Sequence, residues 1–192
     1  MKRVLQILKN PFAIINVKKQ TLIGLFSFVL GIIISYFMQT KIEIIGINSV
    51  SNYKISSILL NQSINVLTLT FILYGLGKFI NKKTRIIDIL NSVLIALIPL
   101  YIGLFQNTNN FIVNEGTKVF TAIENKAIHQ YKPPILFLPI VLIVIVLIVY
   151  YIYLLFIGFK TATNAKKVWH YVLFFIFLII TDLLTSGLIN SI

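Results

Sequence analysis

The chain has no cysteine among its 192 residues and carries little negative charge. Without cysteine it can form no disulfide, no thiolate nucleophile and no cysteine-ligated metal site, so the redox compartment stays undetermined. Asp and Glu number 5 against 17 Lys and Arg, and the formal net charge is +12. Such a charge is typical of proteins that bind nucleic acid or anionic membrane surfaces, and the positions of the charges must decide between them.

Motifs for the common chemistries are missing as well. The two histidines, His129 and His170, do not form the His-Glu-x-x-His pattern of a zinc protease. The chain contains no Gly-x-Ser-x-Gly nucleophile elbow and no Walker A phosphate loop. We therefore expect a non-catalytic protein that binds no metal and no cofactor.

Charged residues are scarce, at 11%, whereas 58% of the residues are hydrophobic. A soluble domain carries about 25% charge. Hydrocarbon roughly 30 Å thick requires about 20 apolar residues of helix, because each backbone polar group inside it must be hydrogen-bonded within its own segment. Five stretches satisfy this requirement. The sequence predicts an all-α, polytopic membrane bundle, with one domain over residues 21–192 and spans at about 21–38, 61–77, 86–105, 134–159 and 168–189.

Lysine and arginine concentrate on alternate connections between these spans. Five precede the first span, four lie between the second and third, and three lie between the fourth and fifth, which makes 12 of the 17. The others lie on the intervening loops, together with Glu43, Glu115 and Glu124. The positive-inside rule then predicts a cytoplasmic N-terminus and an external C-terminus. Because the pattern explains the basic net charge, no nucleic-acid partner is expected.

Residues 1–20 form a basic cytoplasmic segment with two interpretations. Apolar residues alternate with basic ones around Pro11, which is typical of a segment lying in the membrane interface. A disordered tail is the alternative. The apolar run that follows is eighteen residues long and ends without a small-residue cleavage site, so we expect a retained anchor and not a cleaved signal peptide.

The loop at residues 106–133 contains apolar residues at roughly helical spacing, with polar residues between them. Pro133 and Pro134 follow Lys132 and disfavour continuation of a helix. The loop therefore predicts an amphipathic helix that rests on the external membrane surface or caps the bundle.

Asp182 is the one acidic residue deep in a predicted span. An unpaired carboxylate near the bilayer centre costs about 2.5 to 3.5 kcal/mol, so it should face other helices, water or a cation. One interpretation is an intramembrane polar site, made with Thr181 and Thr185, that binds a proton or cation or clamps helices together. The other is a locally satisfied polar end, because Asp182 lies only about 10 Å from the outer end of its helix.

Several residues are candidates for lipid contact or close helix packing. Lys82, Lys83 and Arg85 could bind lipid headgroups or a partner, each charge near an anionic surface contributing about 1 kcal/mol, or could only set the topology. Gly75 and Gly77, in "YGLGK", are small residues of the kind that lets helices approach closely. Pro99 interrupts the third span, where neighbouring groups must satisfy the freed backbone.

The order of these features resembles the Yip1 domain family. The resemblance rests on "NPF" shortly before the first span, on "FILYGLGKFINKKTRIIDILNSVLIALIPLYI" from Phe71 to Ile102, and on "LLFIGFKTATNAKKVWHYVLFFI" from Leu154 to Ile176. It implies five spans, an inward N-terminus and an outward C-terminus, and a proline in the third span, where Pro99 stands. Eukaryotic members act in vesicle traffic with small GTPases and membrane-shaping partners.

The sequence thus predicts a non-catalytic integral membrane protein that organises membrane or binds partners, as a trafficking or adaptor protein does. The expected partners are the lipid bilayer and a membrane protein or a second copy of the chain. The abundance of Ile, Lys and Asn suggests an AT-rich genome, and hence a bacterial cytoplasmic membrane. The alternative is a small transporter or permease subunit that uses Asp182.

Overall fold

The computed structural model describes residues 2–50 and 54–190. Its fold is all-α, as the sequence predicts, and five helices are long and apolar enough to cross a membrane. Two 3₁₀ helices, η1 (Leu104–Asn110) and η2 (Ile128–Gln130), flank the seventh α-helix. The α-helices are α1 (Lys2–Lys9), α2 (Pro11–Ile14), α3 (Val17–Met38), α4 (Ile55–Ile80), α5 (Ile86–Ala96), α6 (Ile98–Gly103), α7 (Phe111–Glu124), α8 (Phe137–Thr163) and α9 (Val168–Asn190).

Each predicted span coincides with a long helical stretch, although the boundaries differ. Helix α3 begins at Val17, before the predicted residue 21, because the Asn16 side chain accepts a hydrogen bond from the Lys19 N–H at 2.9 Å and caps the helix. Helix α8 begins at Phe137, just after the predicted Pro134, since the two prolines and a turn precede it.

The third candidate span lies at the centre of the bundle. It consists of α5 and α6, which pack between α3, α4 and α8. Ile89, Val93 and Leu100 are fully buried along it. Pro99 lies in the first turn of α6, and because proline has no N–H it cannot donate to the carbonyl of Ile95. Helix α5 ends at Ala96 and α6 begins at Ile98, so the two helices meet next to Pro99.

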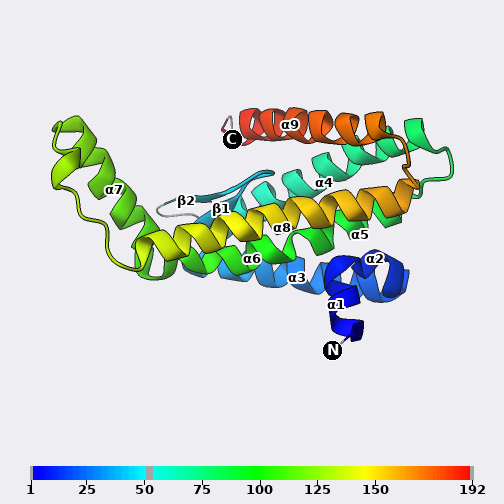
Figure 1. Ribbon diagram of the computed structural model, residues 1–192, viewed down its shortest axis with the longest axis horizontal. Helices are drawn as coiled ribbons and strands as arrows, with labels where there is room; N and C mark the ends of the chain where they lie inside the picture. The colour runs from blue at the N-terminus through cyan, green and yellow to red at the C-terminus, as the bar shows by residue number, and fades with distance from the viewer. Residues whose placement is uncertain (1, 51–53, 191–192) are drawn as a thin grey trace.

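The bundle has two distinct ends (Figure 1). Helices α1 and α2 and the turns at residues 81–85 and 164–167 lie toward one end, which we call the basic end. The opposite end, which we call the hairpin end, carries the loop between α3 and α4 and also α7. Helix α9 packs against α4. Its last described turn lies toward the hairpin end, whereas α1 lies near the basic end (Figure 1).

The loop between α3 and α4 contains a β-hairpin that the sequence analysis did not predict. Strand β1 (Thr40–Ile42) pairs antiparallel with β2 (Ile47–Ser49), with Ile42 opposite Ile47. Ile42 and Ile44 are both 2% exposed, so this side of the hairpin contributes to the core. Strands this short carry almost no periodic signal in a sequence.

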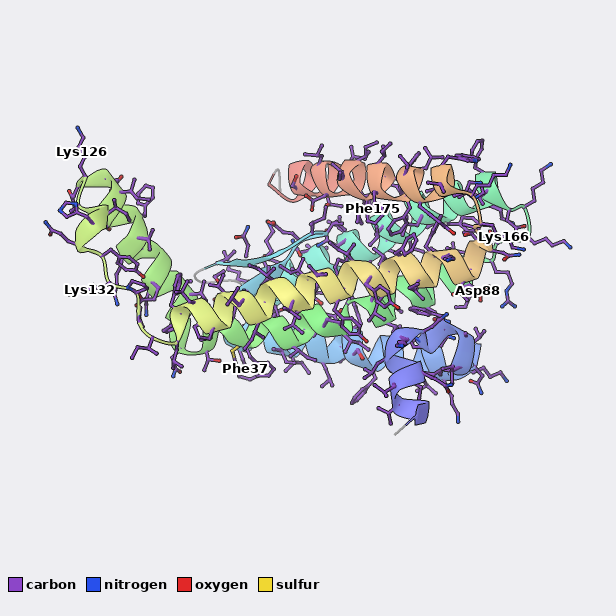
Figure 2. All side chains as sticks on the ribbon, in the orientation of Figure 1. Phe37, Asp88, Lys126, Lys132, Lys166 and Phe175 are labelled. Atoms are coloured by element: carbon purple, nitrogen blue, oxygen red, sulfur yellow. The ribbon has the colours of Figure 1, made fainter. Side chains whose placement is uncertain are left out.

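The predicted amphipathic helix of the loop at 106–133 is present as α7. The chain turns just before it, where Asn109 and Asn110 adopt left-handed φ angles of 56° and 58°, a conformation that asparagine tolerates. Helix α7 then points away from the bundle and does not cap it (Figure 1). Figure 2 shows Lys126 and Lys132 at this extremity, and Asp88 and Lys166 at the other.

The N-terminal segment forms two short helices that are tied to the side of α8. The Tyr150 hydroxyl donates to the Leu8 carbonyl at 2.9 Å, and the Tyr153 hydroxyl donates to the Lys9 carbonyl at 3.0 Å. Helix α1 lies across the direction of the bundle, with its residues Val4, Leu5 and Leu8 exposed (Figure 1). A location in the membrane interface stays a prediction.

Candidate functional site

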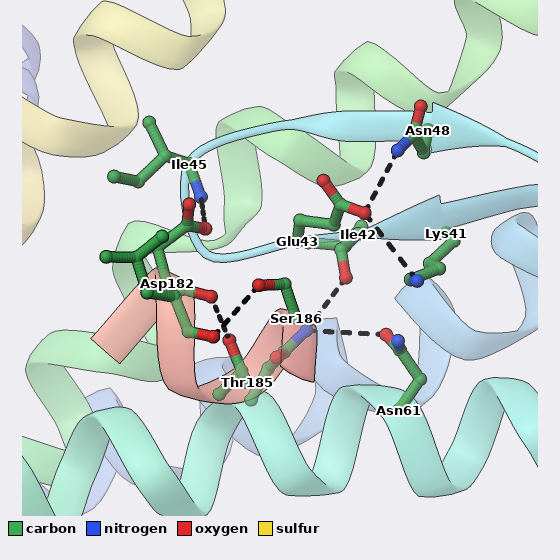
Figure 3. A network of polar contacts seen from close by, with 11 residues as sticks. Lys41, Ile42, Glu43, Ile45, Asn48, Asn61, Asp182, Thr185 and Ser186 are labelled. Atoms are coloured by element: carbon green, nitrogen blue, oxygen red, sulfur yellow. Dashed lines mark hydrogen bonds and ion pairs between the residues drawn. The ribbon is translucent and has the colours of Figure 1, made fainter. Parts of the chain in front are cut away.

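The predicted polar site on α9 lies directly beneath the β-hairpin (Figure 3). The Asp182 Oδ1 atom accepts a hydrogen bond from the backbone N–H of Ile45 at 3.2 Å. The hairpin is therefore joined to the half of α9 that lies toward the hairpin end. This contact is a clamp between a carboxylate and a backbone amide, and it joins α9 to the hairpin, whereas the clamp that the sequence suggested was one between helices.

Thr181 and Thr185 are buried beside Asp182 but satisfy their hydroxyls within their own helix. The Thr181 hydroxyl donates to the Phe177 carbonyl at 2.6 Å, and the Thr185 hydroxyl donates to the Thr181 carbonyl at 3.0 Å. Such back-bonding uses the O–H donor of each threonine and leaves only the lone pairs of its oxygen for a ligand. The three residues thus lie together, and the two threonines match the locally satisfied interpretation.

A second polar attachment joins the hairpin to α4. The Asn65 amide donates to the Ile42 carbonyl at 2.8 Å and to Asn61 Oδ1 at 3.3 Å. One turn away, the Gln62 amide donates to the Ser35 hydroxyl on α3 at 2.8 Å. Asn61, Gln62 and Asn65 are all at most 4% exposed, so α4 presents an amide-rich face to the interior of the bundle.

Much of the hydrogen-bonding capacity of this interior remains unused. Among the described residues, the Gln62 Oε1, Asn65 Oδ1 and Asn61 Nδ2 atoms have no partner, and neither does Thr70 Oγ1. The hydroxyls of Tyr101 and Tyr151 are likewise buried without a partner there. We call the set Ser35, Asn61, Gln62, Asn65, Thr70, Tyr101 and Tyr151 the polar core.

The polar core extends toward Asp182. Tyr151 is near enough to both Tyr101 and Asp182 to interact electrostatically with each. A buried polar group without a partner costs about 1 to 3 kcal/mol, so groups of this kind are sites where water or a small polar ligand binds. The sequence showed that α4 is polar, but not that its amides are buried, nor that Tyr101 of α6 and Tyr151 of α8 are buried with unused hydroxyls.

The lysines predicted to contact lipid headgroups lie exposed in the turn after α4. Lys82 and Lys83 are both exposed. The Lys78 ammonium donates to the Lys82 carbonyl at 2.8 Å. Arg85 differs, because its Nε and Nη2 donate to the Asp88 carboxylate at 2.8 and 2.9 Å. The two lysines are therefore better placed than Arg85 to receive an anion.

Gly75 and Gly77 occupy opposite environments on α4. A Cβ added at Gly77 would lie 3.0 Å from Thr84 Cγ2 and 3.1 Å from Thr163 Cγ2, so neighbouring segments approach the helix closely there. A Cβ added at Gly75 would meet nothing within 4 Å. Gly77 thus fits the packing role predicted for both, whereas Gly75 leaves open space on the outer surface.

A carboxylate on α7 forms a small polar cluster with Lys118 and Tyr131. Glu115 Oε1 accepts from the Lys118 ammonium at 2.6 Å, and Glu115 Oε2 accepts from the Tyr131 hydroxyl at 2.9 Å. The hydrogen bond from Lys118 holds the pKa of Glu115 below its ordinary value. Within the described ranges, 2–50 and 54–190, no three His, Asp or Glu side chains gather in a metal-binding group.

No family model matches the chain, and neither the curated proteins nor the solved structures contain a match.

Proposed function

We propose that the chain is a five-span integral membrane protein, with its N-terminus in the cytoplasm and its C-terminus outside, in a bacterial cytoplasmic membrane. The five apolar helices support insertion. The orientation is supported by the grouping of lysine and arginine at the basic end, which the positive-inside rule assigns to the cytoplasm.

Topology can be measured directly, because the chain has no cysteine of its own. Lys132→Cys and Lys166→Cys introduce one thiol at each end of the bundle, both at exposed lysines. In intact cells, a membrane-impermeant maleimide should label Lys132→Cys alone, and permeabilised cells should allow both to react. Labelling of Lys166→Cys in intact cells would contradict the orientation.

Within that membrane, the chain binds a partner and does not catalyse a reaction, in an adaptor role of the kind that the Yip1 resemblance implies. The observation that supports this role is α7, which projects from the bundle with Phe120 61% exposed and Ile123 57% exposed. An amphipathic helix whose apolar face is left uncovered by its own chain favours a partner.

Photocrosslinking tests the binding role. p-Benzoylphenylalanine replaces Phe120 on α7 and, as the matched control, Phe26 on α3, which is 66% exposed on a predicted lipid-facing surface. Irradiation of native membranes should give a discrete protein adduct from position 120 but not from position 26. An adduct of twice the chain mass would identify a second copy as the partner. Failure of position 120 to give any protein adduct would overturn the proposal.

The polar core supports a second candidate, a small transporter or permease subunit. Its unused amide and hydroxyl groups could bind a polar solute, and the Asp182 carboxylate is near enough to Tyr151 to act on it electrostatically. Asp182→Asn keeps the shape of the side chain but removes its charge. If this change abolishes a proton- or cation-dependent flux in reconstituted vesicles, the transporter function is correct; a variant that loses only stability favours the binding role.

A further inference from the structure

An apolar groove runs between α4 and α9 near the basic end. Its volume is about 710 Å³, which lies within the usual range of ligand pockets, about 300 to 1,000 Å³. Hydrophobic residues and one glycine from these two helices line it. They include Phe71, Gly75 and Phe79 of α4 and Trp169, Leu173 and Phe177 of α9.

The groove has an open surface at Gly75 and an aromatic boundary at one end. Gly75 is exposed, and the space beside its Cα is empty to 4 Å. Nearer the basic end, the rings of Phe79 and Trp169 meet edge to face with their centroids 6.0 Å apart. Tryptophan is enriched at the depth where acyl chains give way to headgroups.

Positive charge collects beside this end of the groove. Lys78 lies in the last turns of α4 with its ammonium 5.5 Å from the Tyr74 ring centroid, and Lys82 and Lys83 follow in the next turn. Lys166 and Lys167 immediately precede α9, and Figure 2 shows Lys166 at this end of the bundle. Neither residues 71–84 nor residues 160–181 contain an Asp or Glu that would neutralise them.

We propose that this groove binds an anionic phospholipid, with an acyl chain along α4 and α9 and the phosphate among these lysines. The site is complementary to such a lipid. It is apolar along its length, where an acyl chain would lie, and cationic at one end, where the phosphate would lie. A packed protein helix would use the apolar surface but would not require the lysines. Free phosphate would require the lysines but not the groove.

Arg85 is outside the proposed site, because Asp88 already accepts hydrogen bonds from its guanidinium. The inference rests on the proposed membrane insertion. If maleimide labelling finds no membrane topology, both proposals fail. If the labelling agrees with the proposed topology but the chain does not prefer anionic lipid, only the proposal of a lipid site fails.

Trp169 provides the assay, since it is the single tryptophan of the chain and lines the groove. The full chain is reconstituted in phosphatidylcholine bilayers that contain a small, equal fraction of either brominated phosphatidylglycerol or brominated phosphatidylcholine. Bromine quenches tryptophan fluorescence on contact. Quenching by brominated phosphatidylglycerol should exceed quenching by brominated phosphatidylcholine, corresponding to an affinity about fivefold higher for each lysine that contacts the phosphate.

Two variants test the two halves of the site. Gly75→Leu places a side chain in the groove and should weaken phosphatidylglycerol binding about 15-fold, the loss expected from displacing two methylene groups at about 0.8 kcal/mol each. Lys82→Gln combined with Lys83→Gln should reduce the preference over phosphatidylcholine about 25-fold if both lysines contact the phosphate. The matched controls are Gly116→Leu, at another glycine with nothing within 4 Å, and Lys126→Gln combined with Lys132→Gln at the hairpin end.

The controls should behave as the unmodified chain does. Equal quenching by the two brominated lipids would overturn the proposal. The proposal would also be overturned if the double variant at Lys82 and Lys83 changed the lipid preference no more than the double variant at Lys126 and Lys132. This comparison leaves the groove itself unaltered. Relief of phosphatidylglycerol quenching by inorganic phosphate at matched ionic strength would instead identify a site for free phosphate, and the lipid assignment would be wrong.

Discussion

Removal of the Asn65 side-chain amide tests whether the hairpin is held by its buried contact with α4. In Asn65→Ala, the bonds to the Ile42 carbonyl and to Asn61 are both lost. The buried Ile42 carbonyl then loses the hydrogen bond that it accepts from the Asn65 amide. The deleted atoms also leave a small cavity between α4 and the hairpin.

The free-energy cost can be bounded from these contacts. A buried group left without its partner costs about 1 to 3 kcal/mol, whereas hydrogen bonds between transmembrane helices average about 0.6 kcal/mol. Asn65 makes two hydrogen bonds, one at 2.8 Å to the backbone of the hairpin and one at 3.3 Å to Asn61 in its own helix. We therefore expect Asn65→Ala to destabilise the fold by about 2 kcal/mol, which is a fall of about 4 to 8 °C in Tm for a chain of this size.

Circular dichroism melting in detergent measures this loss, with Asn48→Ala as the matched control. Asn48 lies on the same hairpin, but its bond to Glu43 Oε1 at 3.0 Å is exposed, so its removal should change stability by no more than about 0.5 kcal/mol. Asn65→Asp keeps the volume and replaces the donating amide with an oxygen that faces the Ile42 carbonyl. If Asn65→Asp melts with the unmodified chain while Asn65→Ala melts lower, packing holds the hairpin and our reasoning is wrong.

Further predictions concern packing, charge and the N-terminal helices. Gly77→Leu should cost about 1 to 3 kcal/mol through overpacking, whereas Gly75→Leu should leave Tm almost unchanged; equal melting temperatures would contradict the contrast. The hydrogen bond from Lys118 lowers the pKa of Glu115. The stabilisation of α7 by this pair is therefore fully present above the ordinary carboxyl pKa and is lost as the pH falls through the lowered pKa of Glu115. Amide-exchange protection of α7 should therefore fall in acid, and Glu115→Gln should remove that pH dependence; the same dependence in both proteins would contradict it. Tyr150→Phe should raise protease cleavage of α1 and α2 about fivefold, the effect of losing one hydrogen bond of about 1 kcal/mol, and an unchanged cleavage rate would refute the attachment.

The helices of the bundle were predictable because a membrane span is a local property of sequence. A run of about 20 apolar residues satisfies its own backbone wherever it lies, so composition alone marks it. The hairpin was not predictable in this way. Its strands are three residues each, and its position depends on Asn65, Asp182 and their backbone partners, which are remote in sequence.

The residues of the candidate sites show the same division. Asp182 was recognisable because a carboxylate in an apolar run is unusual. Its partner, the Ile45 N–H, is a backbone group and leaves no mark on the sequence. Gly75 and Gly77 belong to one small-residue motif, yet one packs against Thr84 and Thr163 and the other opens into the groove. Which face of α4 is covered depends on where the other segments pack.

The last span connects the two sites. Helix α9 packs against α4, and near the basic end its Phe174 ring meets Phe156 of α8 edge to face and Phe159 of α8 at a tilt. Toward the hairpin end, Asp182 holds it to the backbone of Ile45. The lipid groove lies on the α4 side of the same helix. Because one helix carries both contacts, loss of the Ile45 bond would loosen one boundary of the groove. Asp182→Ala removes the accepting oxygen and should therefore lower the preference for anionic lipid although the lysines are unchanged, and an unchanged preference would contradict the coupling.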